Sequence, residues 1–301
     1  MSIRVDSVTK IYGKQRALNG VSFTVDSGEI VGFLGPNGAG KSTMMKIITG
    51  FLHPEEGSVW INGEIIGGNT LNIRRHIGYL PENNPLYPDL YVTEYLEYVA
   101  GIYHLKTIQS RVKEIIGLTG LQSEKHKKIG ALSKGYRQRV GIAQALIHDP
   151  SVLILDEPTS GLDPLQIVEI RQLIRNISAS KTVMLSTHIM QEVEALCDRI
   201  MIINHGKIVA TDTPANIKSL ASANEQNILV EFAESINPHS LQSIHGVLNV
   251  RHLSDKSWLL QGGEIDLRPL IFRFAVDNGF TILTLNRQES TLENVFLEIT
   301  S

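Results

Sequence analysis

The sequence has almost no cysteine and no long apolar segment. Cys197 is the only cysteine among 301 residues, which excludes an internal disulfide and fits a reducing compartment. Beside Val193 and Leu196 in an expected helix, it is predicted to be a small buried hydrophobic residue. No apolar run reaches the roughly 18 residues that cross a bilayer, and the N-terminus lacks the apolar region of a signal peptide. If the protein works at a membrane, we expect another chain to span it.

The sequence also lacks a strong excess of either charge. Its formal net charge is −3, which argues against an extended nucleic-acid surface and leaves only a small local basic patch open. The one basic cluster, at residues 125–128, is expected to be a solvated loop face. With 42% hydrophobic and 20% charged residues, the composition is that of a globular protein with room for two domains.

The first half of the chain alternates strand and helix patterns. Residues 30–34 (IVGFL) predict a buried strand that runs into a glycine-rich loop, and a helix is expected from Gly40 until Gly50 stops it. Residues 85–150 are mostly helical in pattern and indicate a helical insertion. Parallel strands resume with VLIL at 152–155, so we expect an α/β fold over residues 1–220.

The C-terminal part has a different pattern. Residues 219–227 (SLASANEQN) are small and polar, which predicts a linker. Beyond it, the order βαββαβ with a trailing helix predicts a small α+β domain over residues 228–301 that resembles a ferredoxin-like sandwich.

A phosphate-binding motif stands between the first buried strand and its helix. The segment GPNGAGKST fits G-x-x-x-x-G-K-[ST] and has the strand and helix that the motif requires. Backbone N–H groups approach the phosphates, the lysine reaches the β and γ phosphates, and the serine supplies an oxygen to Mg²⁺. These features predict an ATP site formed by Gly35, Pro36, Asn37, Gly38, Ala39, Gly40, Lys41, Ser42 and Thr43.

Two adjacent acids end the strand at 152–155. Carboxylates at this end of a parallel strand lie where α/β sheets bind ligands. We expect Asp156 to hold Mg²⁺, through water, and Glu157 to polarise the attacking water as general base. Without the phosphate-binding loop, the same pair would more often be a helix cap followed by a loop.

The segment LSKGYRQR at 132–139 resembles the signature of ATP-binding cassette (ABC) proteins. It departs from the usual LSGGQ by Lys134 and Tyr136, which favours a change in rate over loss of function. Ser133 and Gly135 match the family positions that touch the γ-phosphate. Because they precede a helix, a hydroxyl and backbone N–H groups would meet one phosphate.

The resemblance extends to four further positions. Asp163 in SGLDP matches the loop that links the sites of two subunits, and His188 in STH matches the switch histidine that contacts the γ-phosphate. Tyr12 matches the aromatic residue that stacks on adenine. Glu82 stands where the family has a glutamine; a carboxylate can give Mg²⁺ an oxygen but lacks the amide donor.

The resemblance covers about residues 1–220 and implies a phosphate-loop cassette with an antiparallel β subdomain and a helical subdomain. It implies ATP hydrolysis with Mg²⁺, pairing of two cassettes as a homodimer or heterodimer, and attachment to membrane-spanning subunits at the inner face of the cell membrane. The tail TLENVFLEIT resembles that of export-type subunits. The strings MMKIITG and IGYLPENNPLY are similar to the gliding-motility ATP-binding subunit of Bacteroidetes.

Two other functions fit parts of the pattern. A soluble ABC ATPase of translation or DNA repair would usually carry a second cassette, a long coiled coil or a zinc hook, and this sequence has one phosphate-binding loop and one cysteine. A catalytically silent cassette is disfavoured because Lys41, Asp156, Glu157 and His188 occur together.

Overall fold

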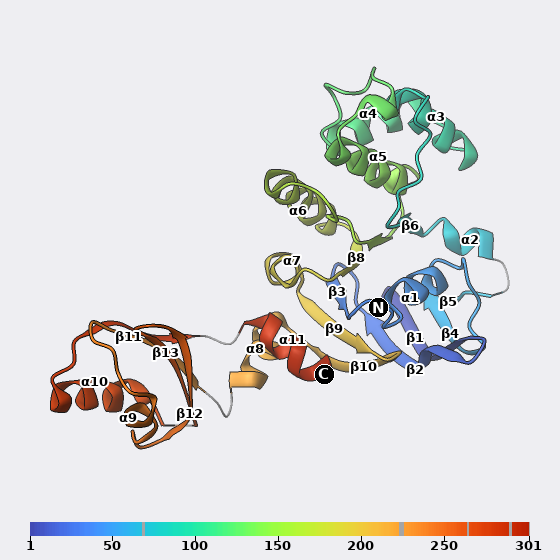
Figure 1. Ribbon diagram of the computed structural model, residues 1–301. Coiled ribbons are helices and arrows are strands. Elements are labelled where there is room, and N and C mark those ends of the chain that lie inside the picture. The colour runs from blue at the N-terminus through green and yellow to red at the C-terminus, as the bar shows by residue number, and fades with distance from the viewer. Residues whose placement is uncertain (68–69, 223–225, 264, 289–290, 301) are drawn as a thin grey trace. The chain divides into compact units, whose positions relative to one another are not determined.

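The computed structural model describes residues 1–67, 70–222, 226–263, 265–288 and 291–300. The chain divides into two compact units, Met1–Pro214 with Thr300, and Ala215–Ile299 (Figure 1). Within these described residues, no helix is both long enough and apolar enough to cross a membrane.

A six-stranded sheet forms the centre of the first unit, in the order β10-β9-β3-β8-β7-β6. All neighbouring strands are parallel except β10, which pairs antiparallel with β9. Strands β3, β7 and β8 are buried along their whole length, which explains their continuous apolar sequences. The bounds are β3 (Ile30–Leu34), β6 (Ile77–Leu80), β7 (Val152–Asp156), β8 (Thr182–Thr187), β9 (Arg199–Asn204) and β10 (Lys207–Asp212).

An antiparallel sheet in the order β2-β1-β4-β5 completes the core of this unit. Its inward side chains and those of the central sheet enclose one buried cluster with helix α1 (Lys41–Ile48). The rings of Phe23 and Phe33 join the two sheets at a centroid distance of 5.8 Å. The strands are β1 (Ile3–Tyr12), β2 (Gln15–Val25), β4 (Glu56–Ile61) and β5 (Glu64–Ile65).

Three helices inserted between β6 and β7 form a helical lobe, drawn in green in Figure 1. Apolar residues at helical spacing on each helix face the interior of this lobe. The lobe contains α3 (Val92–Ile102), α4 (Ile108–Leu118), the 3₁₀ turn η1 (Ile129–Ala131) and α5 (Lys134–Leu146). The other helices of the first unit are α2 (Thr70–Arg74), α6 (Pro164–Ser178) and α7 (Met190–Leu196).

Helix α5 packs closely on β6 because two glycines remove side chains at the contact. A Cβ atom on Gly78 would clash with the Ala145 carbonyl, and one on Gly141 would clash with the side chains of Leu80 on β6 and of Asn84. Against the interior strand β3, Cys197 is buried and its Sγ would lie 2.9 Å from a Cβ on Gly32. The prediction that Cys197 is a small buried hydrophobic residue is therefore confirmed.

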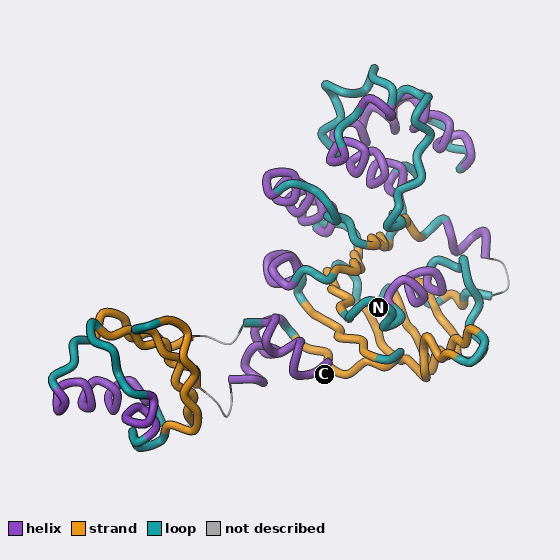
Figure 2. Tube along the Cα trace, viewed as in Figure 1, coloured by secondary structure: helices purple, strands orange, loops and turns teal. Residues whose placement is uncertain are grey.

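The second unit has a four-stranded antiparallel sheet in the order β12-β13-β11-β14. Its strands are drawn in orange in Figure 2. Numbered within the unit, this order is 2-3-1-4, the ferredoxin-like arrangement that the sequence pattern predicted. Phe232 and Trp258 are in its buried core. Its elements are α8 (Pro214–Ser222), β11 (Gln226–Phe232), α9 (Pro238–Gln242), β12 (Val247–Ser254), β13 (Ser257–Gly262), α10 (Leu267–Asn278), β14 (Ile282–Gln288) and α11 (Leu292–Thr300).

The predicted linker at 219–227 was wrong in part. Helix α8 continues to Ser222 and strand β11 already begins at Gln226, while 223–225 lie outside the described residues. Small residues such as alanine and serine are compatible with a helix end, so the prediction from composition alone made the linker too long.

Candidate functional site

The loop between β3 and α1 has the geometry of an anion cradle. Gly38 and Gly40 have φ values of 81° and 112°, a region that side chains disfavour. A Cβ atom on Gly40 would lie 2.5 Å from the Ala17 carbonyl oxygen, so glycine is also required for space. Helix α1 begins without a side-chain cap, and its first N–H groups therefore remain available to an anion.

Lys41 is the buried cation of this loop. Its side chain is 7% exposed, and its Nζ donates hydrogen bonds to the carbonyl oxygens of Gly35, at 2.6 Å, and Pro36, at 3.2 Å. Burial lowers the pKa of Lys41, and the carboxylates of Glu157, Asp156 and Glu82 oppose that shift. Two backbone carbonyls thus hold the ammonium group in the loop, from which it can turn to a phosphate.

The end of β7 positions the two acids differently. Asp156 is 2% exposed and accepts a 2.5 Å hydrogen bond from the Ser186 hydroxyl of neighbouring β8. The same hydroxyl accepts a hydrogen bond from the Glu157 N–H at 3.1 Å. Glu157 itself adopts a left-handed conformation with φ 52°, which is rare for a non-glycine residue and turns its side chain out of the strand direction.

Glu157 meets His188 at this strand end. The His188 Nδ1 lies 2.9 Å from Oε2 and 3.0 Å from Oε1 of Glu157. Burial raises the pKa of Glu157, while His188 and Lys41 lower it and Asp156 raises it further. A carboxylate with a raised pKa beside an imidazole can accept a proton from water near neutral pH.

One pocket of about 380 Å³ collects most of the predicted nucleotide residues. Tyr12 is 48% exposed at its rim, and Lys10 Nζ lies 5.7 Å from the Tyr12 ring centroid. Glu157 lines it, and Asp156 and His188 adjoin it through Glu157. The lining residues are Tyr12, Gln15, Ala17, Asn37, Gly38, Gly40, Lys41, Ser42, Thr43, Glu82 and Glu157.

The donor set around Lys41 suits Mg²⁺ that is bound to a nucleotide. Among the residues that the structure describes, no group of three His, Cys, Asp or Glu side chains could hold a metal alone. Magnesium bound with phosphates needs only one or two protein oxygens because waters and phosphates supply the others. The Ser42 hydroxyl and the Asp156 carboxylate fit that role, and Glu82 lines the same pocket.

A second pocket, of about 210 Å³, holds the predicted residues Ser133, Gly135 and Asp163 and shares no residue with the first. Ser133 caps α5 by accepting a hydrogen bond from the Tyr136 N–H at 3.4 Å. Asp163 caps α6 by accepting one from the Gln166 N–H at 2.8 Å. Gly135 is buried against Gln166, where a Cβ atom would lie 2.7 Å from Cδ. The structure therefore brings Ser133, Gly135 and Asp163 together, apart from Lys41.

Sequence reasoning missed several supporting residues. Gln138 on α5 donates a 2.7 Å hydrogen bond to the Pro158 carbonyl oxygen and so ties the signature helix to the loop after Glu157. The sequence did contain one sign of this role, because Gln138 is a polar residue at a position that helical spacing places on the buried face of its helix. Ser186 was part of the quoted STH segment, but nothing in the sequence indicated its bonds to Asp156 and Glu157. Gln15 and Ala17 had no distinguishing pattern.

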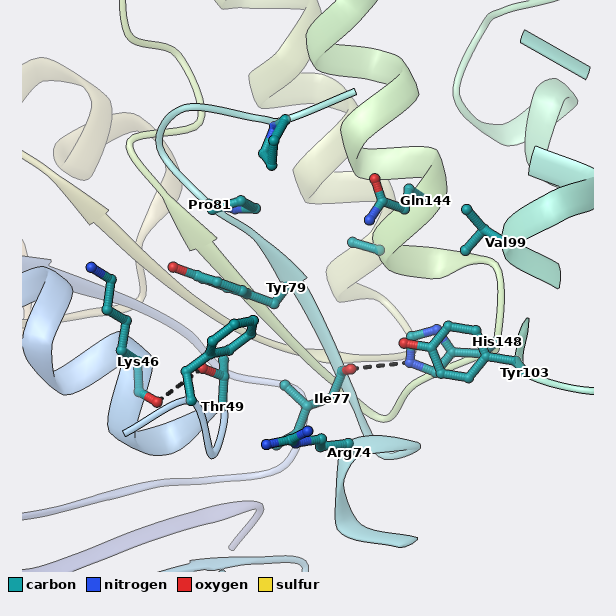
Figure 3. Close-up of a pocket in the computed structure, with 13 residues that line it drawn as sticks. Lys46, Thr49, Arg74, Ile77, Tyr79, Pro81, Val99, Tyr103, Gln144 and His148 are labelled. Carbon is teal, nitrogen blue, oxygen red and sulfur yellow. Dashed lines mark hydrogen bonds between the residues drawn. The ribbon is translucent and has the colours of Figure 1, made fainter. Parts of the chain in front are cut away.

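A mainly apolar groove of about 460 Å³ lies among α1, β6, α3 and α5 (Figure 3). Tyr103 stacks on His148 at a centroid distance of 3.9 Å, and the His148 Nε2 lies 3.0 Å from the Ile77 carbonyl oxygen. The buried Nδ1 of His148 has no hydrogen-bond partner. Burial chiefly lowers the pKa of His148 to about 4, so the imidazole is neutral at pH 7.

The parallel sheet, the glycine loop with Lys41, and the acids at the end of the neighbouring strand define a phosphate-loop nucleoside triphosphatase. The chain belongs to the ATP-binding subunits of ABC transporters, a family that hydrolyses ATP. The family model for ABC transporters matches residues 18–160. The family and cassette-fold predictions are therefore confirmed.

Three similar proteins support this membership. The bacitracin transport ATP-binding protein BcrA of Bacillus licheniformis is 33% identical, over 99% of this chain and 96% of its own. The Nod factor export ATP-binding protein I of Burkholderia lata is 39% identical over 69% of each chain. A dimeric post-hydrolysis structure of the cassette MJ0796 with ADP and Pi covers 70% of this chain and 98% of its own, with 30% identity and a TM-score of 0.65.

Proposed function

We propose that this protein drives export through a separate membrane-spanning subunit by cleaving ATP between two facing cassettes. The observation that carries the proposal is the division of the predicted site. Lys41 and Glu157 line one pocket, and Ser133 and Asp163 line another with no residue in common. Two copies that face each other would join the first pocket of one chain to the second pocket of the other, as a homodimer or with a related cassette.

The first pocket supplies the chemistry in this proposal. Lys41 and the N–H groups at the start of α1 bind the phosphates, and Tyr12 stacks on the adenine. Ser42 and Asp156 would hold Mg²⁺, with Glu82 as a further oxygen donor, and the ion would offset phosphate charge. Glu157 accepts a proton from the attacking water, and His188 orients Glu157 and contacts the terminal phosphate.

The second pocket serves the neighbouring chain. The first N–H groups of α5, with the Ser133 hydroxyl and Gly135, contact the terminal phosphate held by the facing Lys41. Asp163 fixes the start of α6 and so the loop that would join the two sites. The dimeric solved cassette, at 30% identity, supports this arrangement for the present chain.

The membrane partner is proposed to dock at the groove of Figure 3 and along residues 86–103. Aromatic rings cluster there: Tyr87 lies 5.9 Å from the buried Tyr95 and 6.1 Å from Tyr98, both edge to face. Tyr87 and Tyr98 are 56% and 52% exposed. Exposed rings beside an apolar groove are typical of an interaction surface.

The export direction is supported by relatives whose names state bacitracin transport and Nod factor export. A link to gliding motility is supported only by the strings MMKIITG and IGYLPENNPLY. We propose a position on the inner face of the cell membrane, with no nucleic-acid partner.

Crosslinking in native membranes tests the partner. A Tyr98→Cys variant should crosslink to a membrane-spanning protein, and affinity isolation should recover the same protein. Leu118→Cys is the matched control, since Leu118 is 43% exposed at the end of α4 but lies outside residues 86–103. Equal crosslinking from both positions, or recovery of soluble proteins only, would contradict the proposal.

A further inference from the structure

Lys134 occupies an electrostatically unfavourable position. It is the first residue of α5, directly after the capping Ser133, and it is exposed. The N-terminus of a helix carries partial positive charge, so a cation there is repelled where an acid would be favoured. The first turn of α5 contains no acidic residue to offset it. A residue that is unfavourable for its local structure, with no nearby residue to offset the cost, is expected at functional positions.

No carboxylate in the described part of the chain forms an ion pair with Lys134. The Lys134 side chain also forms no hydrogen bond with the described residues, although neighbouring Arg139 is paired with Glu169 at 2.7 Å. The Asp163 carboxylate, in the loop before α6, accepts a hydrogen bond from the Gln166 N–H and none from Lys134. The ammonium group and the start of α5 therefore offer positive charge on the face that carries Ser133, and no described carboxylate forms an ion pair with that ammonium group.

The side chain of Lys134 nevertheless has a defined position. Its Nζ lies against Gly161, where a Cβ atom would overlap it, and Gly161 has φ 67°, which favours glycine. Gly161 belongs to the SGLDP segment that ends in Asp163. The ammonium group thus lies between the start of α5 and the loop that precedes α6, at the border of the second pocket.

We infer that Lys134 delivers an additional cation to the terminal phosphate of the nucleotide held by the facing chain. The inference rests on the proposed function, because only a facing nucleotide would bring an anion to this surface. ATP carries that phosphate and ADP does not, so Lys134 would stabilise the closed pair selectively when ATP is bound. Lys134 would then be a specificity residue of the composite site.

The test uses the full-length Glu157→Gln protein, in which bound ATP persists, and measures the dimer dissociation constant by sedimentation. Lys134→Gln should weaken ATP-driven pairing roughly tenfold per site, hence about 100-fold for the two sites of a dimer. Pairing should also become less sensitive to salt. Lys134→Arg should stay within about threefold of the parent, since the charge remains. Lys113→Gln, an exposed lysine on α4, is the matched control and should change nothing.

Binding of a fluorescent ATP analogue to dilute monomers provides an independent readout. Lys134→Gln should keep the affinity of the parent there, because Lys41 holds the nucleotide within one chain. Equal weakening of pairing by Lys134→Gln and Lys134→Arg would show a packing role against Gly161 and overturn the inference.

Ser133→Arg separates this inference from the proposed function. If Ser133→Arg abolishes pairing while Lys134→Gln pairs like the parent, the role of Lys134 is wrong and the composite site stands. If Ser133→Arg still pairs, the proposed arrangement itself fails, and the inference fails with it.

Discussion

His188 and Glu157 meet at the ends of adjacent parallel strands, with the imidazole Nδ1 2.9 Å from the carboxylate Oε2. The register that pairs Asp156 with Ser186 places both side chains just beyond the sheet. Glu157 also has φ 52°, a conformation that costs free energy and persists only where surrounding contacts hold it. The Ser186 hydroxyl supplies one such contact by accepting the Glu157 N–H.

Glu157→Gln should retain ATP binding and lower hydrolysis by at least about 10²-fold, because an amide cannot accept the proton of the attacking water. Steady-state phosphate release and nucleotide affinity measure the two effects separately. Glu64→Gln, at an exposed position of β5, is the control and should behave like the parent. Near-normal turnover by Glu157→Gln would require a different base.

His188→Ala should shift the acid limb of the pH–rate profile to higher pH. The pKa of Glu157 is raised by burial and lowered by its hydrogen bond to His188, so loss of the imidazole raises it further. A base is inactive when protonated, and the rate therefore falls earlier as the pH is lowered. A limb that stays in place, measured in single-turnover hydrolysis, would mean that His188 does not act on Glu157.

His148 should make the stability of the protein depend on pH. Its pKa is lowered from 6.5 to about 4 in the folded state, so between these values the unfolded chain binds more protons. Stability therefore rises with pH across this window, by up to about 3 kcal/mol. Urea unfolding at pH 7 and pH 5 should show a smaller difference for His148→Gln than for the parent. His126→Gln, at an exposed position, should keep the full difference.

A truncated protein of residues 1–222 should fold and bind ATP. The first unit is compact through Pro214, and α8 ends at Ser222, so this cut leaves the nucleotide pocket intact. We expect altered pairing or regulation and preserved ATP affinity. Insoluble or non-binding protein from several neighbouring end points would refute an independent domain at residues 228–301.

The sequence predicted the elements that carry strong local signals. Gly35 to Thr43 is a motif whose spacing alone implies a loop before a helix, and apolar runs such as 152–155 imply buried strands. The ferredoxin-like order of the second unit also followed from the order of its patterns.

Other features depend on contacts between distant segments and left no local trace. The Gln138 bond to Pro158 joins residues of α5 and the loop after β7, and the groove beside His148 is closed by α1, β6 and two helices of the helical lobe. The separation of Ser133 from Lys41 likewise arises from the fold, since the family motifs say only that both are present.

The central claim is that each ATP is cleaved at a site built from two chains, and mixing two inactive proteins tests it most directly. Lys41→Ala cannot hold the phosphates, and Ser133→Arg blocks the site of its neighbour. In a mixed dimer, one site carries both defects and the other carries neither, so hydrolysis should reappear at up to about half the parental rate per mixed dimer. Crosslinking confirms that mixed dimers form. A shared site would be contradicted if such dimers recovered no hydrolysis and if a mixture of the Glu157→Gln and Ser133→Arg proteins also remained inactive.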